Sequence, residues 1–330
     1  MAEDKYLLEI KDLSVEFKLR DKKNQTVKAV DHVSLNVEKG KTLAIVGESG
    51  CGKSTLGRAV LHLIPHTGGE VFMNGKDLTL QLKKDQKKIR KSMQIVFQDP
   101  YASLNPRMRV KSIIEEPIRF HNVASSKEEI DKEIEKVMSD CGLPTYFKDR
   151  YPHEFSGGQR QRICIARALA SKPDLVILDE PVSALDVSIQ SQIINLLQDL
   201  QLQRNLTYIF ISHDLSVVNH IADQVAVMYL GSLVELAPKK ELYENPSHPY
   251  TQALLSAIPS DNPNHKKEHI VLEGEIPSAS NPPSGCKFRT RCKMACSICS
   301  QMVPELVEIS PGHKVACHLY KLAREENKLQ

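Results

Sequence analysis

The strongest constraint on the fold of this chain is a short glycine-rich motif near residue 50. Residues 47–55 read Gly-Glu-Ser-Gly-Cys-Gly-Lys-Ser-Thr and fit the pattern G-x-x-x-x-G-K-[ST]. A run rich in β-branched residues, 42–46, precedes the motif, and a helix-like stretch, 56–63, follows it. Because this order presents backbone N–H groups and a helix N-terminus to an anion, the motif predicts a nucleotide phosphate site.

Two side chains of this loop have predicted chemical roles. Lys53 places a cation on the β- and γ-phosphates, and the Ser54 hydroxyl is a ligand for Mg²⁺. A glycine-rich turn without any ligand is the structural alternative, and the strand and helix on either side of the motif argue against it. The loop residues expected to contact ATP are Gly47, Glu48, Ser49, Gly50, Cys51, Gly52, Lys53, Ser54 and Thr55.

Two further motifs complete a predicted ATPase site. The apolar run 175–178 ends in Asp179 and Glu180, which places one carboxylate to hold Mg²⁺ and the next to polarise an attacking water. A second helix start with bare backbone amides follows Phe155, at Ser156, Gly157, Gly158 and Gln159. Two such anion sites in one chain predict a dimer, in which each chain closes the phosphate loop of the other.

The remaining pattern predicts an α/β protein with a second, smaller domain. Strands are expected at 7–19, 27–37, 42–46, 94–97, 175–178, 208–211 and 225–229, with a turn at 20–25. Residues 100–170 are expected to form a helical insertion, and apolar residues between 189 and 200 recur at helical spacing, with Asp186 or Ser188 as the cap. Frequent prolines after residue 244 predict domains at 1–255 and 256–330.

These motifs together resemble the ATP-binding subunit of an ABC transporter, over the first 240 or so residues. In that family's terms, 47–55 resembles Walker A, 175–179 Walker B and 156–159 the signature motif, with Phe155 where leucine is usual. The resemblance implies a P-loop NTPase core with an antiparallel β subdomain and a helical insertion. It also implies that Gln98 joins Ser54 and Asp179 around Mg²⁺ and touches the membrane subunits. Further roles implied are those of the catalytic glutamate for Glu180, the D-loop for Asp186 and the switch histidine for His213. Phe17 is the candidate for stacking on adenine, with a core strand residue as the alternative.

Several longer segments are similar to oligopeptide and dipeptide importer ATPases, most closely to their F-type subunit. They are 98–106, 150–154, 180–188, 248–255, 274–277 and 281–292. The resemblance implies a heterodimer with a related D-type ATPase under two membrane permease subunits, served indirectly by an extracytoplasmic peptide-binding protein. It implies a peripheral position on the cytoplasmic face of the plasma (inner) membrane.

Two alternatives to a peptide importer stay open. The first is an importer of nickel or another small solute. The second is a non-transport ABC protein acting on nucleic acid, which a single cassette without a long coiled coil disfavours. A net charge of +3 is too small to argue for nucleic acid, and none is expected as a partner.

Five of the eight cysteines lie between residues 286 and 317. No export signal is recognised at the start of the sequence, so thiols or metal ligands are expected rather than disulfides. Cys286, Cys292, Cys299 and Cys317 form a set whose spacing fits zinc or an iron–sulfur cluster. The importer resemblance favours [4Fe–4S] at these four positions, with Zn²⁺ as the alternative. Cys296 departs from the family pattern and leaves the choice among the middle cysteines open.

Overall fold

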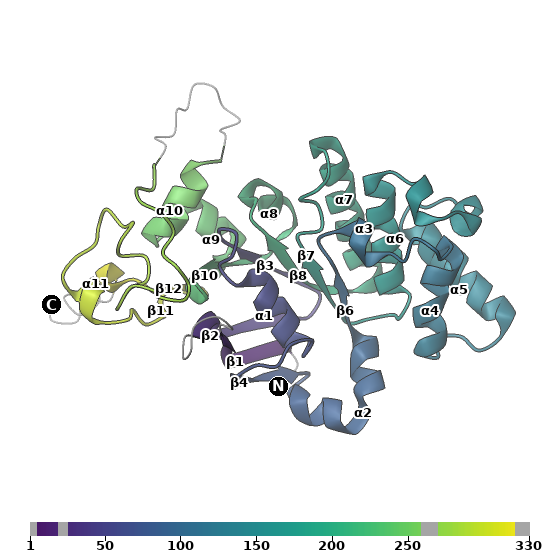
Figure 1. The fold of residues 1–330 in the computed structure, drawn as a ribbon, viewed down its shortest axis with the longest axis horizontal. Helices are drawn as coiled ribbons and strands as arrows, with labels where there is room; N and C mark the ends of the chain where they lie inside the picture. The colour runs from purple at the N-terminus through teal and green to yellow at the C-terminus, as the bar shows by residue number, and fades with distance from the viewer. Residues whose placement is uncertain (1–4, 19–25, 259–269, 321–330) are drawn as a thin grey trace. The chain divides into compact units, whose positions relative to one another are not determined.

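The chain folds into two compact units, each assembled from separated segments. The computed structural model describes residues 5–18, 26–258 and 270–320 (Figure 1). The first unit draws on Met1–Glu9, Asn36–Thr42 and Glu70–Ser212, and the second on Ile10–Leu35, Leu43–Gly69 and His213–Gln330. Because both units mix early and late parts of the chain, the predicted division at residue 255 stays a prediction.

A parallel set of strands lies at the centre of the first unit, in the order β8-β7-β6. Its strands are β6 (Met93–Val96), β7 (Leu175–Asp179) and β8 (Thr207–Ser212), and both pairings are parallel. Every residue of β7 and β8 is buried, as expected for parallel strands covered on both faces. The three predicted strands are confirmed, with ends that differ by at most one residue.

The α-helices that the structure describes in the first unit include those that confirm the predicted helical insertion at 100–170. They are α2 (Leu78–Ser92), α3 (Pro100–Ser103), α4 (Val110–Phe120), α5 (Lys127–Asp140), α6 (Gly157–Leu169) and α7 (Val187–Arg204). Figure 1 shows α3 to α6 gathered into one helical group, and α6 packs against α3, α4 and α5. Helix α7 buries the apolar face between Ile193 and Leu200, as its helical spacing predicts.

The second unit contains a mixed set of strands in the order β11-β12-β10-β9-β3. They are β3 (Thr42–Val46), β9 (Gln224–Tyr229), β10 (Ser232–Pro238), β11 (Val307–Ser310) and β12 (His313–Val315). β3 runs parallel to β9, and the other pairings are antiparallel. Leu230 and Gly231, both with positive φ, form the tight turn from β9 to β10. Parallel and antiparallel pairing together confirm the α/β class.

Among its described residues, the second unit has the helices α1 (Lys53–Val60), α8 (Leu215–Ile221), α9 (Lys239–Glu244), α10 (Pro249–Ser256) and α11 (Ile298–Gln301). The predicted helix at 56–63 therefore begins three residues earlier, directly at Lys53. Described residues 270–320 belong to the same unit as β3 and β9, so a separate cysteine-rich unit is not shown.

A further sheet has the order β2-β1-β4-β5. Its strands are β1 (Tyr6–Lys18), β2 (Thr26–Glu38), β4 (Gly68–Met73) and β5 (Lys76–Asp77), and β4 pairs antiparallel with β5. The end of the first predicted strand at residue 19 and the turn at 20–25 lie outside the described residues. Among the helices that the structure describes, none is both long and apolar enough to cross a membrane.

Candidate active site

The phosphate loop joins β3 to α1 and holds its own lysine. Lys53 is 4% exposed, and its Nζ donates hydrogen bonds to the carbonyl oxygens of Gly47 at 2.8 Å and Glu48 at 3.0 Å. A buried ammonium needs acceptors, and two loop carbonyls supply them here. The same ammonium is therefore already positioned inside the loop that is predicted to surround the phosphates.

Two glycines of the loop are required by the backbone that passes behind them. Gly47 has a φ of +149°, and a Cβ there would lie 2.3 Å from the Met228 carbonyl oxygen on β9. Gly52 has a φ of +104°, and a Cβ there would lie 2.0 Å from the Ala29 carbonyl oxygen on β2. A side chain at either position would displace main chain, so the loop keeps its shape only with glycine. Burial raises the pKa of the neighbouring Cys51 thiol.

The predicted magnesium and catalytic residues of the first unit meet at the end of β7. Asp179 is its last residue and is 2% exposed. Glu180 follows with a positive φ of 48° and donates its backbone N–H to the Ile211 carbonyl on β8 at 3.0 Å. Gln98, two residues beyond β6, donates from Nε2 to Glu180 Oε2 at 2.9 Å. The structure thus brings together two residues that are 82 positions apart in the sequence.

The signature residues cap α6. Ser156 is the N-cap; its Oγ accepts from Gln159 N at 3.4 Å, and Gln159 Oε1 accepts from Ser156 N at 3.0 Å. This reciprocal pair is a capping box, which fixes the start of the helix. Gly158 is buried against the first turn of α7, where an added Cβ would lie 2.5 Å from Ile189 Cγ2. The signature therefore lies directly beside the start of α7.

The D-loop residue Asp186 is the N-cap of α7 by position, as expected, but its side chain makes no capping hydrogen bond. His213 follows β8 and is exposed. Phe17, on β1, is 43% exposed, so the alternative that it is a core residue is wrong. The predicted roles of these three residues in nucleotide binding and hydrolysis stay predictions.

Sequence reasoning missed what holds the phosphate loop from behind. Tyr250 Oη, on α10, accepts a hydrogen bond from Glu48 N at 2.9 Å. Arg291 binds the Glu48 carboxylate with two nitrogens, at 2.8 and 3.1 Å. Both partners lie more than 200 residues downstream of Glu48, and the sequence gives no local signal for such a contact.

The cysteine set is close enough for its thiols to influence one another. Burial raises the pKa of Cys317 to about 11, and the thiols of Cys286, Cys292 and Cys299 add to the rise. Cys296 Sγ lies 3.6 Å from Cys299 Sγ. Within the described ranges, no three histidine, cysteine, aspartate or glutamate side chains come together as a group that could hold a metal ion.

Comparison with known proteins places these features in one family. The ABC transporter family matches residues 30–183, which include the phosphate loop, the signature and the end of β7. The family described as the C-terminal region of oligopeptide/dipeptide transporters matches residues 234–299. The second match includes Tyr250 and Arg291, the two residues that contact Glu48.

Individual relatives agree with the family matches. The oligopeptide transport ATP-binding protein AppF of Bacillus subtilis (strain 168) is 55% identical, over 97% of this chain and 99% of its own length. The dipeptide transport ATP-binding protein DppF of Escherichia coli (strain K12) is 54% identical, over 91% and 89%. The dimeric post-hydrolysis structure of the ATP-binding cassette MJ0796, bound to ADP and Pi, is 28% identical with a TM-score of 0.63, covering 70% of this chain and 98% of that one.

Proposed function

This chain belongs to the family of ABC transporter ATP-binding proteins, and we propose that it hydrolyses ATP to power the import of di- and oligopeptides. The observation that carries the proposal is the Gln98–Glu180 hydrogen bond at the end of β7, beside a buried Asp179. The peptide as cargo is supported by the names of the relatives AppF and DppF and by the match to the peptide-transporter C-terminal region.

Each predicted residue has a role in the hydrolysis. Lys53 and the loop amides hold the β- and γ-phosphates, and Glu180 orients a water for in-line attack on the γ-phosphorus. As the new P–O bond forms, the bond to the β-phosphate oxygen breaks, Glu180 takes the proton of the water, and ADP leaves. Ser54, Gln98 and Asp179 are the residues that would hold Mg²⁺, which neutralises charge on the phosphates. His213 is proposed to contact the γ-phosphate.

Two substitutions with matched controls test the ATPase. Lys53→Ala is expected to lose ATP binding, because the cation on the phosphates is removed. Glu180→Gln is expected to keep ATP binding and lose at least 100-fold in hydrolysis, the order of magnitude that a general base contributes. The controls are Lys172→Ala and Glu133→Gln, each of which breaks the ion pair between these two residues. They are expected to change neither ATP binding nor ATP hydrolysis. Undiminished hydrolysis by Glu180→Gln would reject the assigned base.

The transport function needs a test of its own. A strain that lacks this subunit is expected to lose uptake of a labelled dipeptide or oligopeptide, and the wild-type gene, but not Lys53→Ala, is expected to restore it. Restored uptake of nickel or another small solute, with no effect on peptides, would favour the alternative cargo instead.

We also propose the assembly in which the ATPase works. Two ATP-binding chains face each other head to tail, so that Ser156–Gln159 of one closes the phosphate loop of the other. The partner is a related D-type ATPase, and the pair docks on two membrane permease subunits at the cytoplasmic face of the inner membrane. An extracytoplasmic peptide-binding protein supplies the cargo. Support comes from the dimeric cassette MJ0796 and from the exposure of Ser156.

A [4Fe–4S] cluster on Cys286, Cys292, Cys299 and Cys317 is proposed as a further component. Support comes from the placement of these cysteines, since the thiols of Cys286, Cys292 and Cys299 add to the raised pKa of Cys317 and therefore lie in its neighbourhood. Anaerobically purified protein is expected to contain about four iron and four sulfide per chain. Cys317→Ser is expected to lose them, whereas Cys296→Ser keeps them. Colourless protein with one zinc, or with no metal, would reject the cluster.

A further inference from the structure

The segment between Cys286 and Cys292 packs behind the phosphate loop, within the second unit. Phe288 is 2% exposed, and its ring lies 5.3 Å from the ring of Tyr229 and 5.3 Å from that of Tyr250. Tyr229 is the last residue of β9. The residue before it, Met228, has the carbonyl oxygen that lies behind Gly47. The aromatic cluster therefore fixes this segment against the strand that supports the loop.

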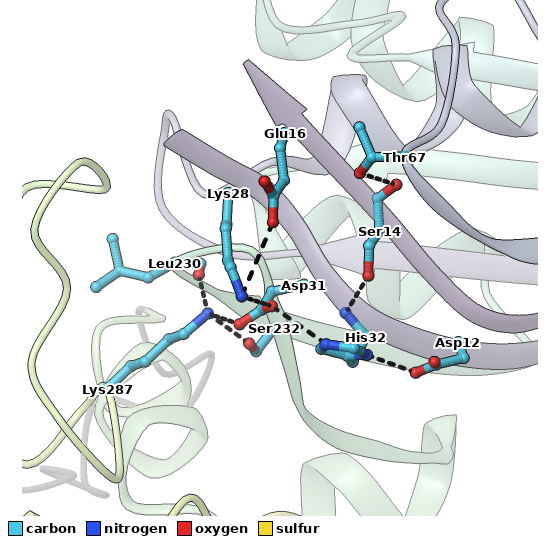
Figure 2. Close-up of polar contacts among 10 residues, drawn as sticks. All are labelled: Asp12, Ser14, Glu16, Lys28, Asp31, His32, Thr67, Leu230, Ser232 and Lys287. Carbon is cyan, nitrogen blue, oxygen red and sulfur yellow. Dashed lines mark hydrogen bonds and ion pairs between the residues drawn. The ribbon is translucent and has the colours of Figure 1, made fainter. Parts of the chain in front are cut away.

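Lys287 makes a second anchor for the same segment. Its Nζ donates to the Leu230 carbonyl at 2.8 Å and to Ser232 Oγ at 2.7 Å, and it pairs with Asp31 at 2.8 Å (Figure 2). Figure 2 shows the ammonium reaching the turn between β9 and β10 from one side while Asp31 approaches from β2. Gly231, at the centre of this turn, donates its N–H to the Cys51 carbonyl at 2.9 Å. The anchor thus holds the two neighbours of Gly231, the residue that bonds to Cys51 of the phosphate loop.

Arg291 provides the direct contact to the loop. Its guanidinium binds the Glu48 carboxylate through two hydrogen bonds, with the arginine side chain 7% and the glutamate side chain 23% exposed. A bidentate, charge-assisted pair of this kind is among the stronger polar interactions in proteins, and partial burial limits its screening by salt. Glu48 is therefore held in one position and its charge is neutralised.

Glu48 also connects this ion pair to the lysine of the site. Its backbone N–H donates to Tyr250 Oη, and its carbonyl accepts from Lys53 Nζ at 3.0 Å. A shift of Glu48 would move an acceptor of the Lys53 ammonium. An unneutralised carboxylate at this position would in addition repel the phosphates that the loop is built to bind.

We propose that Arg291 is a positioning residue for nucleotide binding, which fixes Glu48 and cancels its charge so that the phosphate loop accepts ATP. The inference rests on the proposed function, since it takes the loop to be the ATP site. It assigns a role to the C-terminal segment, whose cysteine-flanked stretch sets the strength of nucleotide binding through one arginine.

Isothermal titration calorimetry tests the proposal, by measuring the Kd of the purified full-length chain for ATP in the presence of Mg²⁺. Arg291→Ala is expected to raise the Kd for ATP about tenfold, the order of magnitude for losing a charge-assisted hydrogen-bonded pair. Glu48→Gln combined with Arg291→Ala is expected to recover most of that affinity, because the repelling charge is gone. Arg289→Ala is the matched control. The Arg289 side chain bonds to Ser284, just before the segment, and the Kd of this variant for ATP should equal that of the wild type.

The double variant separates charge neutralisation from a merely structural role. If Arg291 only stabilised the fold, Glu48→Gln would not rescue Arg291→Ala, and that result would overturn the proposal, as would an unchanged Kd in Arg291→Ala. Should Arg291→Ala not fold, Arg291→Gln keeps a hydrogen-bonding side chain without the charge and is expected to show the same weakened, rescuable binding. Failure of the wild-type chain to bind ATP would instead reject the proposed function.

Discussion

Glu48 carries a negative charge inside a loop whose backbone is arranged to bind anions. The structure resolves this conflict with a single residue, Arg291, which covers the carboxylate with two hydrogen bonds. The ammonium of Lys53 is likewise satisfied within the loop, by the carbonyl oxygens of Gly47 and Glu48. At the scale of residues, each of these two charges in the loop therefore has specific partners, an arginine for Glu48 and backbone carbonyls for Lys53.

A buried histidine gives the protein a predictable response to acid. Burial lowers the pKa of His248 from 6.5 to about 4, against the opposing effect of the Glu235 carboxylate. The unfolded chain therefore binds a proton before the folded chain does, and stability falls as the pH drops from 6.5 towards 4. The loss is expected to reach roughly 3 kcal/mol in the free energy of unfolding, at 1.36 kcal/mol per pKa unit.

Urea unfolding at a series of pH values checks this expectation. His248→Asn keeps a side-chain acceptor for Tyr250 N, which His248 Nδ1 supplies in the wild type, and removes the titrating ring. This variant is expected to show a flatter dependence between pH 6.5 and 4. The exposed control His220→Asn should retain the wild-type slope. An equally steep slope in His248→Asn would show that other groups carry the acid sensitivity.

Two helices of the first unit begin with the same capping device and offer a matched pair. Ser126 and Glu129 form a capping box at α5, as Ser156 and Gln159 do at α6. Ser126→Ala and Ser156→Ala are each expected to cost about 1 kcal/mol of stability, since each removes one cap. Only Ser156→Ala is expected to lower ATPase activity in the presence of the D-type partner. Equal activities in the two variants, measured at saturating ATP, would contradict the assigned role of the signature.

At the scale of elements, the sequence predicted what short-range pattern encodes. The predicted ends of β3, β7 and β8 lie within one residue of the observed ends, because continuous β-branched runs are typical of buried parallel strands. β10 was missed because Glu235 interrupts its apolar run, although this carboxylate is fully buried and is bound by Ser247 N, His248 N and His313. Such long-range compensation leaves no local signal.

The same distinction between short-range pattern and long-range contact applies to the residues of the candidate site. The residues of the phosphate loop, the β7 carboxylates and the signature were identified because their chemistry demands fixed spacing. The contacts of Glu48 with Tyr250 and Arg291 were not, since each partner is an ordinary residue until the fold brings it to the loop. The Gln98–Glu180 bond lies between these cases: both residues were identified from their motifs, but their contact was not.

For the whole molecule, the proposed dimer predicts a change of assembly with nucleotide. Glu180→Gln mixed with the D-type partner is expected to form a stable heterodimer with ATP and Mg²⁺, because bound ATP then persists between the chains. Light scattering after size exclusion measures the mass directly. Adding Lys53→Ala to the same chain should abolish the ATP-dependent shift. A mass that does not respond to ATP would contradict closure around the nucleotide.

The support of the phosphate loop from residues far downstream has a consequence for biosynthesis. The loop leaves the ribosome early, whereas Arg291 follows Glu48 by 243 positions. At about 5–20 residues per second, the nascent chain spends roughly 12–50 s with the loop translated but its arginine still missing. An unfinished polypeptide would hold nucleotide weakly during this interval, so that binding matures only as translation nears its end.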